Sequence, residues 1–518
     1  MAARSFGSSS WNRSTRRSSS NEEGLLPPPV PEPIEDAFRR TRTELEIRSG
    51  FPEEVLREAA RVAEERAPVA SPERIDRTSV PFVTIDPPGS RDLDQAVHAE
   101  RAGDGYRLRY AIADVGFWVD RGGAVEREAW LRGVTFYAPD HREPLYPPVL
   151  SQGVASLLAD ETRAALLFDF ALDARGELRS WSVERALVRS RAQLTYAQLL
   201  QHAVQPEASP LAGTAWADTL SLIGEIGPKR LALEVERGGV SLPVRDQHVQ
   251  RRAAAALGYE LTYEEPNEAE RWNAQLSLLT GHVAATRMLE AGVGLLRTMP
   301  PFDERDVAKF RRIARTLGFA WPEGRSYAEF MHGLPPGHPR IDVLVRQARR
   351  VMRGADYVAF DGAPPEQPLH GAMATTYAHV TAPLRRLADR YVLDLLATLA
   401  AGARPTDADV AMLRELAPLM DAADGRASAL ERRVVDIAEA WALRGRIGEL
   451  LPAVVVDARR GEVEVQVDVP PIRAEVRVGD APVPPLGARV DVRLAAVDQA
   501  SGRIRLELAR PSTAAPSP

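Results

Sequence analysis

The spacing of apolar residues changes twice along the chain, and this limits the folds that the chain can adopt. From about 80 to 170 apolar and polar residues alternate, and Tyr106, Leu108 and Tyr110 follow a glycine-rich turn in the pattern of a β-hairpin. From about 193 to 450 the apolar spacing is mainly helical. The pattern predicts an α+β protein with a large mixed α/β domain.

The last 60 or so residues return to strict alternation. Five short Val-rich runs follow one another here. Their number and length match those of the strands in a small OB-type barrel. The five candidate strands are centred on Val454 to Val456, Val463 to Val467, Val476 to Val478, Val490 to Leu494 and Ile504 to Leu508.

The chain begins with a Ser/Arg-rich and then Pro-rich stretch that lacks apolar periodicity. We interpret this stretch as a disordered basic arm in preference to an organellar transit peptide, because no amphipathic stripe is evident. The predicted parts are an arm over 1–34, a short helical segment over 35–79, a large domain over 80–448, an OB-like barrel over 449–510 and a tail over 511–518.

Composition excludes several classes of protein. The chain has no cysteine, so disulfides, thiolate catalysis and Cys-ligated zinc are excluded. No apolar run approaches the length of a membrane span, so we expect no membrane partner. The formal net charge of −6 argues mildly against nucleic acid as a partner, unless arginines gather locally.

The densest chemical signal is a group of three carboxylates, Asp86, Asp92 and Asp94, around a Pro/Gly turn. Asp92 and Asp94 share one face of an extended segment because they lie two residues apart. Crowded carboxylates repel one another unless a cation neutralises them, and Mg²⁺ prefers such oxygen ligands. An ordinary surface turn explains the same residues about equally well.

The segment Asp86 to Ala96 resembles the signature of the ribonuclease II/ribonuclease R catalytic domain. The resemblance implies that Asp86, Asp92 and Asp94 are catalytic and bind Mg²⁺, with Mn²⁺ as an alternative. The family has a fourth aspartate where Gln95 stands. Gln95 offers a neutral oxygen as a metal ligand and no charge, so the resemblance implies weaker binding of one of two metals.

Two further segments match this family in the expected order. The first, Arg132 to Asp140, places Tyr137 where the family has a tyrosine that stacks on the terminal base. Taken alone, a tyrosine is more often a half-buried core residue. The second, Tyr377 to Arg386, places Arg385 where the family has an arginine at the scissile phosphate, with Arg386 as a further substrate contact.

The resemblance also implies a substrate-binding role for Glu431, although a Glu/Arg-rich helix is often only a solvated face. For Arg390 we prefer such a solvated face, and for His379 a structural or RNA-adjacent role. The family usually has Glu and Asn where Gln275 and Gly281 stand. The part before residue 80 is too short for the paired cold-shock domains of better-known members.

The leading hypothesis is a Mg²⁺-dependent 3′-to-5′ exoribonuclease that degrades single-stranded RNA to nucleoside monophosphates. We expect a cytoplasmic monomer, with Arg346, Arg350 and Arg353 on one helix face beside the RNA. The alternatives are a catalytically weakened RNA-binding relative, because of Gln95, and a metal-dependent phosphodiesterase of small nucleotides.

Overall fold

The computed structural model describes residues 33–242, 245–252, 258–335, 337–459, 461–479 and 482–509. The predicted arm, apart from its last two residues, and the predicted tail lie outside these ranges. The described part begins with two helices, α1 (Ile34–Glu44) and α2 (Glu53–Glu65). Within the described ranges, no helix combines the length and the apolar character needed to cross a bilayer.

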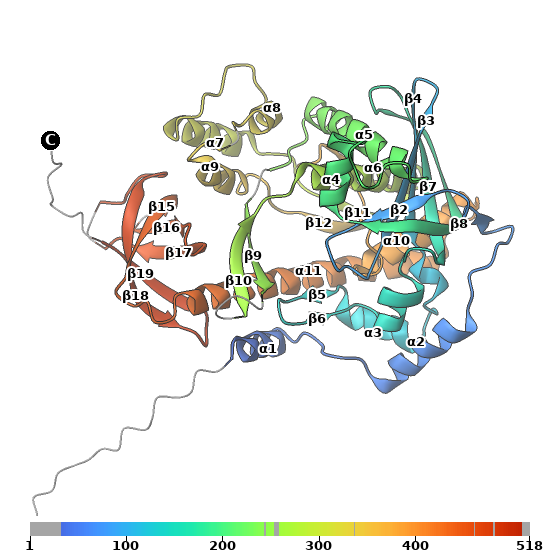
Figure 1. Cartoon of the computed structure of the whole chain (residues 1–518), viewed down its shortest axis with the longest axis horizontal. Coiled ribbons are helices and arrows are strands. Elements are labelled where there is room, and N and C mark those ends of the chain that lie inside the picture. The colour runs from blue at the N-terminus through green and yellow to red at the C-terminus, as the bar shows by residue number, and fades with distance from the viewer. Residues whose placement is uncertain are drawn as a thin grey trace, which may run out of the picture. The chain divides into compact units, whose positions relative to one another are not determined.

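The large domain is built around a six-stranded sheet of order β1-β8-β2-β3-β4-β7 (Figure 1). The strands are β1 (Ile75–Asp76), β2 (Phe82–Ile85), β3 (Gln95–Ala102), β4 (Gly105–Ala113), β7 (Thr162–Leu172) and β8 (Leu178–Leu194). The expected β-hairpin is confirmed, because Ala102 pairs with Gly105 across the β3–β4 turn. A side chain at Gly105 would collide with the Leu172 carbonyl, 2.1 Å from its Cβ position, so the turn requires glycine.

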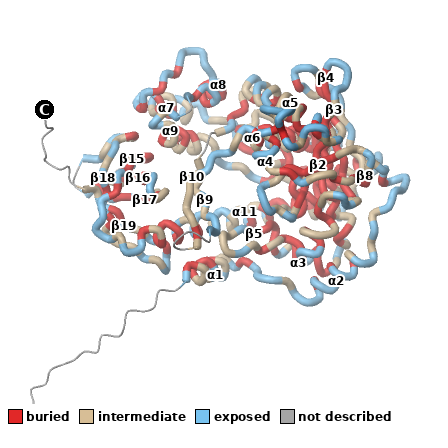
Figure 2. The backbone as a smooth tube through the Cα atoms, in the orientation of Figure 1, coloured by how far each residue is buried: buried red, intermediate tan, exposed pale blue. Residues whose placement is uncertain are grey.

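The long strand β8, with 17 residues, holds this sheet together. Its first part pairs antiparallel with β7, and its last part, Ser190 to Leu194, pairs parallel with β2. Since β2, β3, β4 and β7 are neighbours in turn, β8 closes a ring of strands. Figure 2 shows buried residues concentrated along these strands, where Leu108, Phe168 and Phe170 are fully buried.

Short elements connect β4 to β7. They are the 3₁₀ turn η1 (Val115–Phe117), helix α3 (Ala124–Arg132), strands β5 (Phe136–Tyr137) and β6 (Arg142–Glu143), and the π turn η2 (Leu150–Val154). We call β5, β6 and the residues between them the tyrosine hairpin, because Tyr137 lies on it and pairs with Arg142 in the register.

The predicted helical region is helical, with three two-stranded ladders among its helices. The helices are α4 (Tyr196–Val204), α5 (Ala217–Glu236), α6 (Glu268–Ala291), α7 (Glu304–Thr316), α8 (Tyr327–His332), α9 (Ile341–Ala348), α10 (Leu387–Ala400) and α11 (Asp407–Ala442). The ladders join β9 (Asp246–Arg251) to β10 (Tyr259–Glu264), β11 (Val293–Thr298) to β12 (Asp356–Asp361), and β13 (Leu369–His370) to β14 (Thr375–Thr376).

The C-terminal part is the expected five-stranded barrel, of order β17-β16-β15-β18-β19. Its strands are β15 (Leu450–Arg459), β16 (Glu462–Val467), β17 (Ile472–Arg477), β18 (Arg489–Asp498) and β19 (Arg503–Leu508). The edge strands β17 and β19 pack on each other, so the barrel is nearly closed. Val463, Val465 and Leu494 fill its core, as the alternation predicted. The predicted fold class is confirmed.

The expected helix over 343 to 353 ends earlier, at Ala348. Arg346 and Arg350 do not line the large cavity described below, and they pair with Glu464 and Asp457 of the barrel. The predicted helix was too long, and the ion pairs could not be predicted from one helix alone, because the acids lie more than 100 residues further along the chain.

Candidate active site

A cavity of about 2370 Å³ lies between the large domain and the barrel. Its walls come from the loop between β2 and β3, the tyrosine hairpin, α5, α6, the segment between α8 and α9, and strands β15 and β18. The predicted residues that line this cavity are Asp86, Asp92, Asp94, Gln95, Tyr137, Arg385 and Arg386. The fold therefore brings together residues separated by about 300 positions in the sequence.

The three aspartates, which we call the acidic wall, are held by the backbone around them. Asp86 follows β2 directly, and its N–H donates to the carbonyl of Leu194 at the end of β8, 2.9 Å away. Leu93 is fully buried, and its N–H donates to the Ser156 hydroxyl at 2.9 Å. Since side chains alternate along an extended segment, burial of Leu93 directs Asp92 and Asp94 to the opposite side, toward the cavity.

Burial makes two carboxylates of the acidic wall, Asp86 and Asp94, hard to ionise. Burial and the charge of Asp92 raise the pKa of Asp86 to about 7, although Arg385 opposes this shift. Burial also raises the pKa of Asp94 to about 8, against the effects of Arg385 and of the Leu384 N–H. The Oδ2 atom of Asp86 is buried and has no hydrogen-bond partner. A cation in the cavity would relieve both costs.

The tyrosine hairpin contacts the acidic wall through two side chains. The Tyr137 hydroxyl donates to Asp92 Oδ2 at 3.4 Å, and Arg142 Nη1 donates to Asp92 Oδ1 at 2.7 Å. Tyr137 is 49% exposed, so its ring is available for stacking in the cavity. Sequence reasoning missed Arg142. Its position across a short turn from Tyr137, in a hairpin pattern, was the available signal.

Arg385 and Arg386 follow Pro383 in the segment 381–386, which we call the proline turn. The two arginines have different environments. Arg385 is about half exposed, and its Nε lies 3.6 Å from Asp94 Oδ2. Arg386 forms two hydrogen bonds with the buried carboxylate of Asp389, both 2.7 Å long. Burial alone would lower the pKa of Arg386, but Asp389 raises it overall. Arg385 is therefore free to meet a phosphate, whereas Arg386 mainly fixes the turn.

The backbone connects this turn to the tyrosine hairpin. The Thr135 N–H donates to the Arg385 carbonyl at 2.9 Å, and Val134 forms an antiparallel bridge with Arg386. The Leu384 N–H donates to Asp94 Oδ1 at 2.7 Å. Arg385, Tyr137 and Asp94 are thus positioned by direct contacts between their segments.

Gln95 lines the cavity, but its side chain is engaged elsewhere. Its Nε2 donates to the Thr381 carbonyl at 2.6 Å, and its Oε1 accepts hydrogen bonds from Tyr110 and, at 3.4 Å, from Ser277. The side chain joins β3 and β4 to α6 and the proline turn. The Gln95 amide therefore forms hydrogen bonds within the protein, whereas we expected it to be a metal ligand.

Glu431 is the predicted site residue that the structure does not bring to the cavity. It is exposed on α11 and does not line the cavity. The two residues of α6 that differ from the family pattern, Gln275 and Gly281, contact neighbouring parts of the fold. Gln275 is buried beside Glu234, to which its amide donates, and a side chain at Gly281 would collide with the ring of Tyr377, whose Cε2 lies 2.2 Å from the Cβ position.

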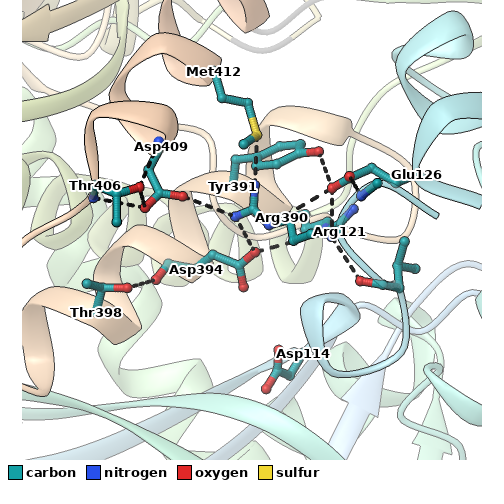
Figure 3. Close-up of polar contacts among 12 residues, drawn as sticks. Asp114, Arg121, Glu126, Arg390, Tyr391, Asp394, Thr398, Thr406, Asp409 and Met412 are labelled. Carbon is teal, nitrogen blue, oxygen red and sulfur yellow. Dashed lines mark hydrogen bonds and ion pairs between the residues drawn. The ribbon is translucent and has the colours of Figure 1, made fainter.

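Two other residues, one inside the second matching segment and one just after it, are structural. Burial lowers the pKa of His379 well below its ordinary value, and its Nδ1 lies 2.6 Å from the Tyr357 hydroxyl. Arg390 was expected on a solvated face, but it is 1% exposed. Figure 3 shows Arg390 among Glu126, Tyr391 and Asp394, with the Glu126 carboxylate 3.1 Å from its Nη2. The expectation failed because this charge is neutralised by residues of distant elements.

The acidic wall fits a divalent cation in its chemistry, with three carboxylates and one buried oxygen without a partner. Nevertheless, among the described residues no three His, Cys, Asp or Glu side chains form a ready group around one ion. Mg²⁺ suits this arrangement, because it usually takes one or two carboxylates, keeps several waters and adds substrate phosphates. Asp86, whose Oδ2 atom has no hydrogen-bond partner, would hold it together with Asp94.

Comparison with known proteins agrees with this architecture. Ribonuclease R of Escherichia coli (strain K12) is 29% identical over 351 residues, which cover 65% of this chain and 42% of that protein. Ribonuclease R of Aquifex aeolicus (strain VF5) is 27% identical over 410 residues, covering 77% and 57%. The chain thus spans about two-fifths to three-fifths of the length of these relatives.

Solved structures share the fold at low sequence identity. Mycoplasma genitalium RNase R in complex with ribose-methylated single-stranded RNA matches with a TM-score of 0.82 and 18% identity, over 92% of this chain and 78% of that one. Yeast Ssd1, a pseudonuclease, matches with a TM-score of 0.66 and 18% identity, over 85% and 54%.

Two family models match the chain. The model described as the RNase II-type exonuclease C-terminal S1 domain matches residues 449–509, which form the barrel. The model described as the RNB domain matches residues 74–402, more than half of the chain and the part that carries the acidic wall, Tyr137 and Arg385. The chain belongs to the RNB family.

Proposed function

We propose that the protein is a metal-dependent 3′-to-5′ exoribonuclease that degrades single-stranded RNA to nucleoside monophosphates. The observation that carries this proposal is the convergence of the acidic wall, Arg385 and Tyr137 on one region of a cavity large enough for several nucleotides. We further propose that Mg²⁺ is the cation, with Mn²⁺ as a substitute, and that the protein is a cytoplasmic monomer.

Each residue has a distinct part in the reaction. Tyr137 stacks on the terminal base, which suits an enzyme that ignores sequence, because every base has a π-face. Arg385 donates hydrogen bonds to the scissile phosphate and stabilises the charge that grows on its oxygens. Water adds to phosphorus, and the ribose 3′-oxygen leaves with a proton. A bound divalent cation supplies the Lewis acidity for this displacement.

Arg142 positions this machinery. In the structure it holds Asp92 at 2.7 Å, and it pairs with Tyr137 across the tyrosine hairpin. It therefore keeps the stacking ring and the acidic wall in register before RNA arrives. As a guanidinium at the cavity wall, it also provides a second cation for the terminal phosphates.

A second candidate function is RNA binding with little or no cleavage. Gln95 supports this candidate, because it removes one negative charge and its amide is engaged with Tyr110 and Thr381. Yeast Ssd1, a pseudonuclease, has a similar fold, so this fold also occurs in a protein of that kind. The three aspartates and Arg385 favour the enzyme, because a pure RNA binder gains nothing from carboxylates that face phosphates.

The test is incubation of a 5′-labelled single-stranded RNA oligomer with the protein and Mg²⁺. Asp94→Asn and an all-deoxy oligomer serve as controls. We expect products that shorten stepwise from the 3′ end with the wild type, and none with the variant or on DNA. Intact RNA that both proteins bind, with Mn²⁺ as well, would support the RNA-binding relative, and cleavage of small nucleotides alone would support a general phosphodiesterase.

A further inference from the structure

Helix α7 has one packed face and one cationic face. Phe310, Ala314 and Leu317, the residue that ends the helix, are buried in an apolar cluster with residues of α8 and α9. The opposite side is exposed to solvent. We call the exposed cations on that side the α7 cationic face, and they are Arg305, Lys309, Arg312 and Arg315.

Helical geometry places these four cations in one row. Their spacings of four, three and three residues keep them on one side of a helix with 3.6 residues per turn. With a rise of about 1.5 Å per residue, the row from Arg305 to Arg315 is about 15 Å long. A row of this length spans several phosphates of an extended RNA strand.

The α7 cationic face has no acidic partner within the described residues. None of its four side chains forms an ion pair or a hydrogen bond, although many arginines of this chain do. Arg311, on the side of the helix, differs: it stacks on Trp321 at 4.5 Å. Cations near the C-terminal end of a helix are stabilised by the helix dipole, which explains Arg312 and Arg315. The dipole does not explain Arg305, which lies near the beginning of the helix.

The C-terminal end of α7 lies at the rim of the cavity. Arg340 lines the cavity, and its Nη1 donates to the Leu317 carbonyl at 3.3 Å. From the barrel, Gly487 also lines the cavity, and a Cβ there would lie 3.1 Å from the Leu317 side chain. The cationic row therefore starts beside the cavity wall, near Arg315, and continues outside the cavity to Arg305.

We propose that the α7 cationic face binds the phosphate backbone of single-stranded RNA upstream of the 3′ end that lies in the cavity. This inference rests on the proposed function. A chain with a net charge of −6 repels RNA on average, so a local row of unpaired cations is needed where the strand leaves the cavity. Contacts to phosphates alone carry no sequence information, which suits a sequence-independent substrate.

The test compares RNA affinity for two lengths with R305Q/K309Q/R312Q/R315Q. Fluorescence anisotropy in EDTA, which prevents cleavage, would measure binding of a 6-nucleotide RNA that fits the cavity and of a 30-nucleotide RNA. We expect the variant to bind the long RNA at least tenfold more weakly and the short RNA within twofold of wild type. The salt slope for the long RNA should fall by about 0.7 for each lost phosphate contact.

A matched control removes the same charge elsewhere. The variant R57Q/R61Q/R101Q/R175Q replaces four exposed arginines that form surface ion pairs outside α7 and the cavity. Equal affinities of both variants for the long RNA would overturn the role of α7. A different result would contradict the proposed function: the wild type would bind both RNAs but shorten neither in Mg²⁺ or Mn²⁺. In that case the measured affinities would still test the role of α7.

Discussion

The three carboxylates of the acidic wall have different hydrogen-bond and ion-pair partners. These partners determine which oxygen binds a cation most strongly. Asp92 is compensated by Arg142, and Asp94 by the Leu384 N–H and Arg385, whereas one oxygen of Asp86 has no partner. The least compensated oxygen is the strongest site for a cation. Gln95 beside them is neutral and keeps its amide on Thr381 and Tyr110.

Replacing Gln95 by aspartate tests the role of its neutral amide. In Gln95→Asp the Thr381 carbonyl loses its donor and faces a carboxylate, so the metal-free protein should lose about 1–3 kcal/mol of unfolding free energy. Metal affinity should rise, because the cavity gains a negative charge. Urea denaturation in EDTA and calorimetric Mn²⁺ titration measure the two effects. Ser277→Ala, which removes the 3.4 Å contact with Gln95 and the 3.1 Å contact with Tyr110 but leaves the Thr381 carbonyl its donor, is the control. An unchanged stability of Gln95→Asp would contradict the assigned role of Gln95.

Glu439 gives a prediction about pH. Burial raises the pKa of Glu439 from 4.5 to about 8, although the Arg473 N–H and Gln247 oppose the shift. The folded protein therefore keeps a proton that the unfolded chain has lost, so this contribution to stability is present below pH about 4.5 and disappears as pH rises to about 8.

Glu439→Gln should flatten the pH dependence of stability in this window. The effect should be on the order of a few kcal/mol, because one pKa unit corresponds to about 1.4 kcal/mol. Denaturation series at several pH values, with Asp498→Asn as an exposed control, measure it. Parallel curves for wild type and Glu439→Gln would mean that Glu439 ionises normally in the folded protein.

Local sequence was sufficient to place some residues of the site and not others. Asp86, Asp92 and Asp94 were predictable because one short turn and a spacing of two determine their common side. Arg142 was missed, because its contact with Asp92 spans 50 residues. The burial of Arg390 could not be predicted either, because Glu126 lies 264 residues before it and no local pattern connects the two.

At the scale of elements, α1 braces the tyrosine hairpin. Arg42 forms two hydrogen bonds of 2.7 and 2.8 Å with Asp140, which lies in the turn of the hairpin, and both side chains are nearly buried. After the helix, the Gly50 N–H donates to Glu143 on β6 at 3.3 Å. The N-terminal segment therefore holds the element that carries Tyr137.

Loss of this brace should loosen the tyrosine hairpin. Arg42→Gln leaves Asp140 without its partner, which should cost about 1–3 kcal/mol locally. Hydrogen exchange of residues 134–144 should become faster, and the rate of RNA shortening should fall. The exposed variant Arg39→Gln on the same helix serves as the control. Exchange that matches this control would show that α1 does not brace the hairpin.

At the scale of the whole molecule, the barrel is attached to the large domain by ion pairs as well as by apolar packing. Arg346 contacts Glu464, Arg350 contacts Asp457, and Val456 of the barrel joins the apolar cluster of α7 to α9. The sequence predicted the barrel from its alternation alone. The way it docks depends on pairs between distant elements, which alternation does not reveal.

The double variant Arg346→Gln/Arg350→Gln should weaken this attachment. We expect a lower melting temperature that depends less on salt, with the affinity for a 6-nucleotide RNA unchanged, because these side chains do not line the cavity. Calorimetry and anisotropy measure the two quantities, and Arg353→Gln is the exposed control. A lost RNA affinity at an unchanged melting temperature would support direct RNA contact by these arginines.

The hydrogen bond between Leu384 and Asp94 joins residues 290 positions apart. A ribosome makes the chain from its N-terminus, so the acidic wall leaves the exit tunnel long before the proline turn that completes it. On the proposed function, the growing protein cannot shorten RNA until Arg385 and its neighbours have also left the tunnel. A nuclease assembled in this order remains harmless to the message that encodes it while the segment between Asp94 and Leu384 is being made.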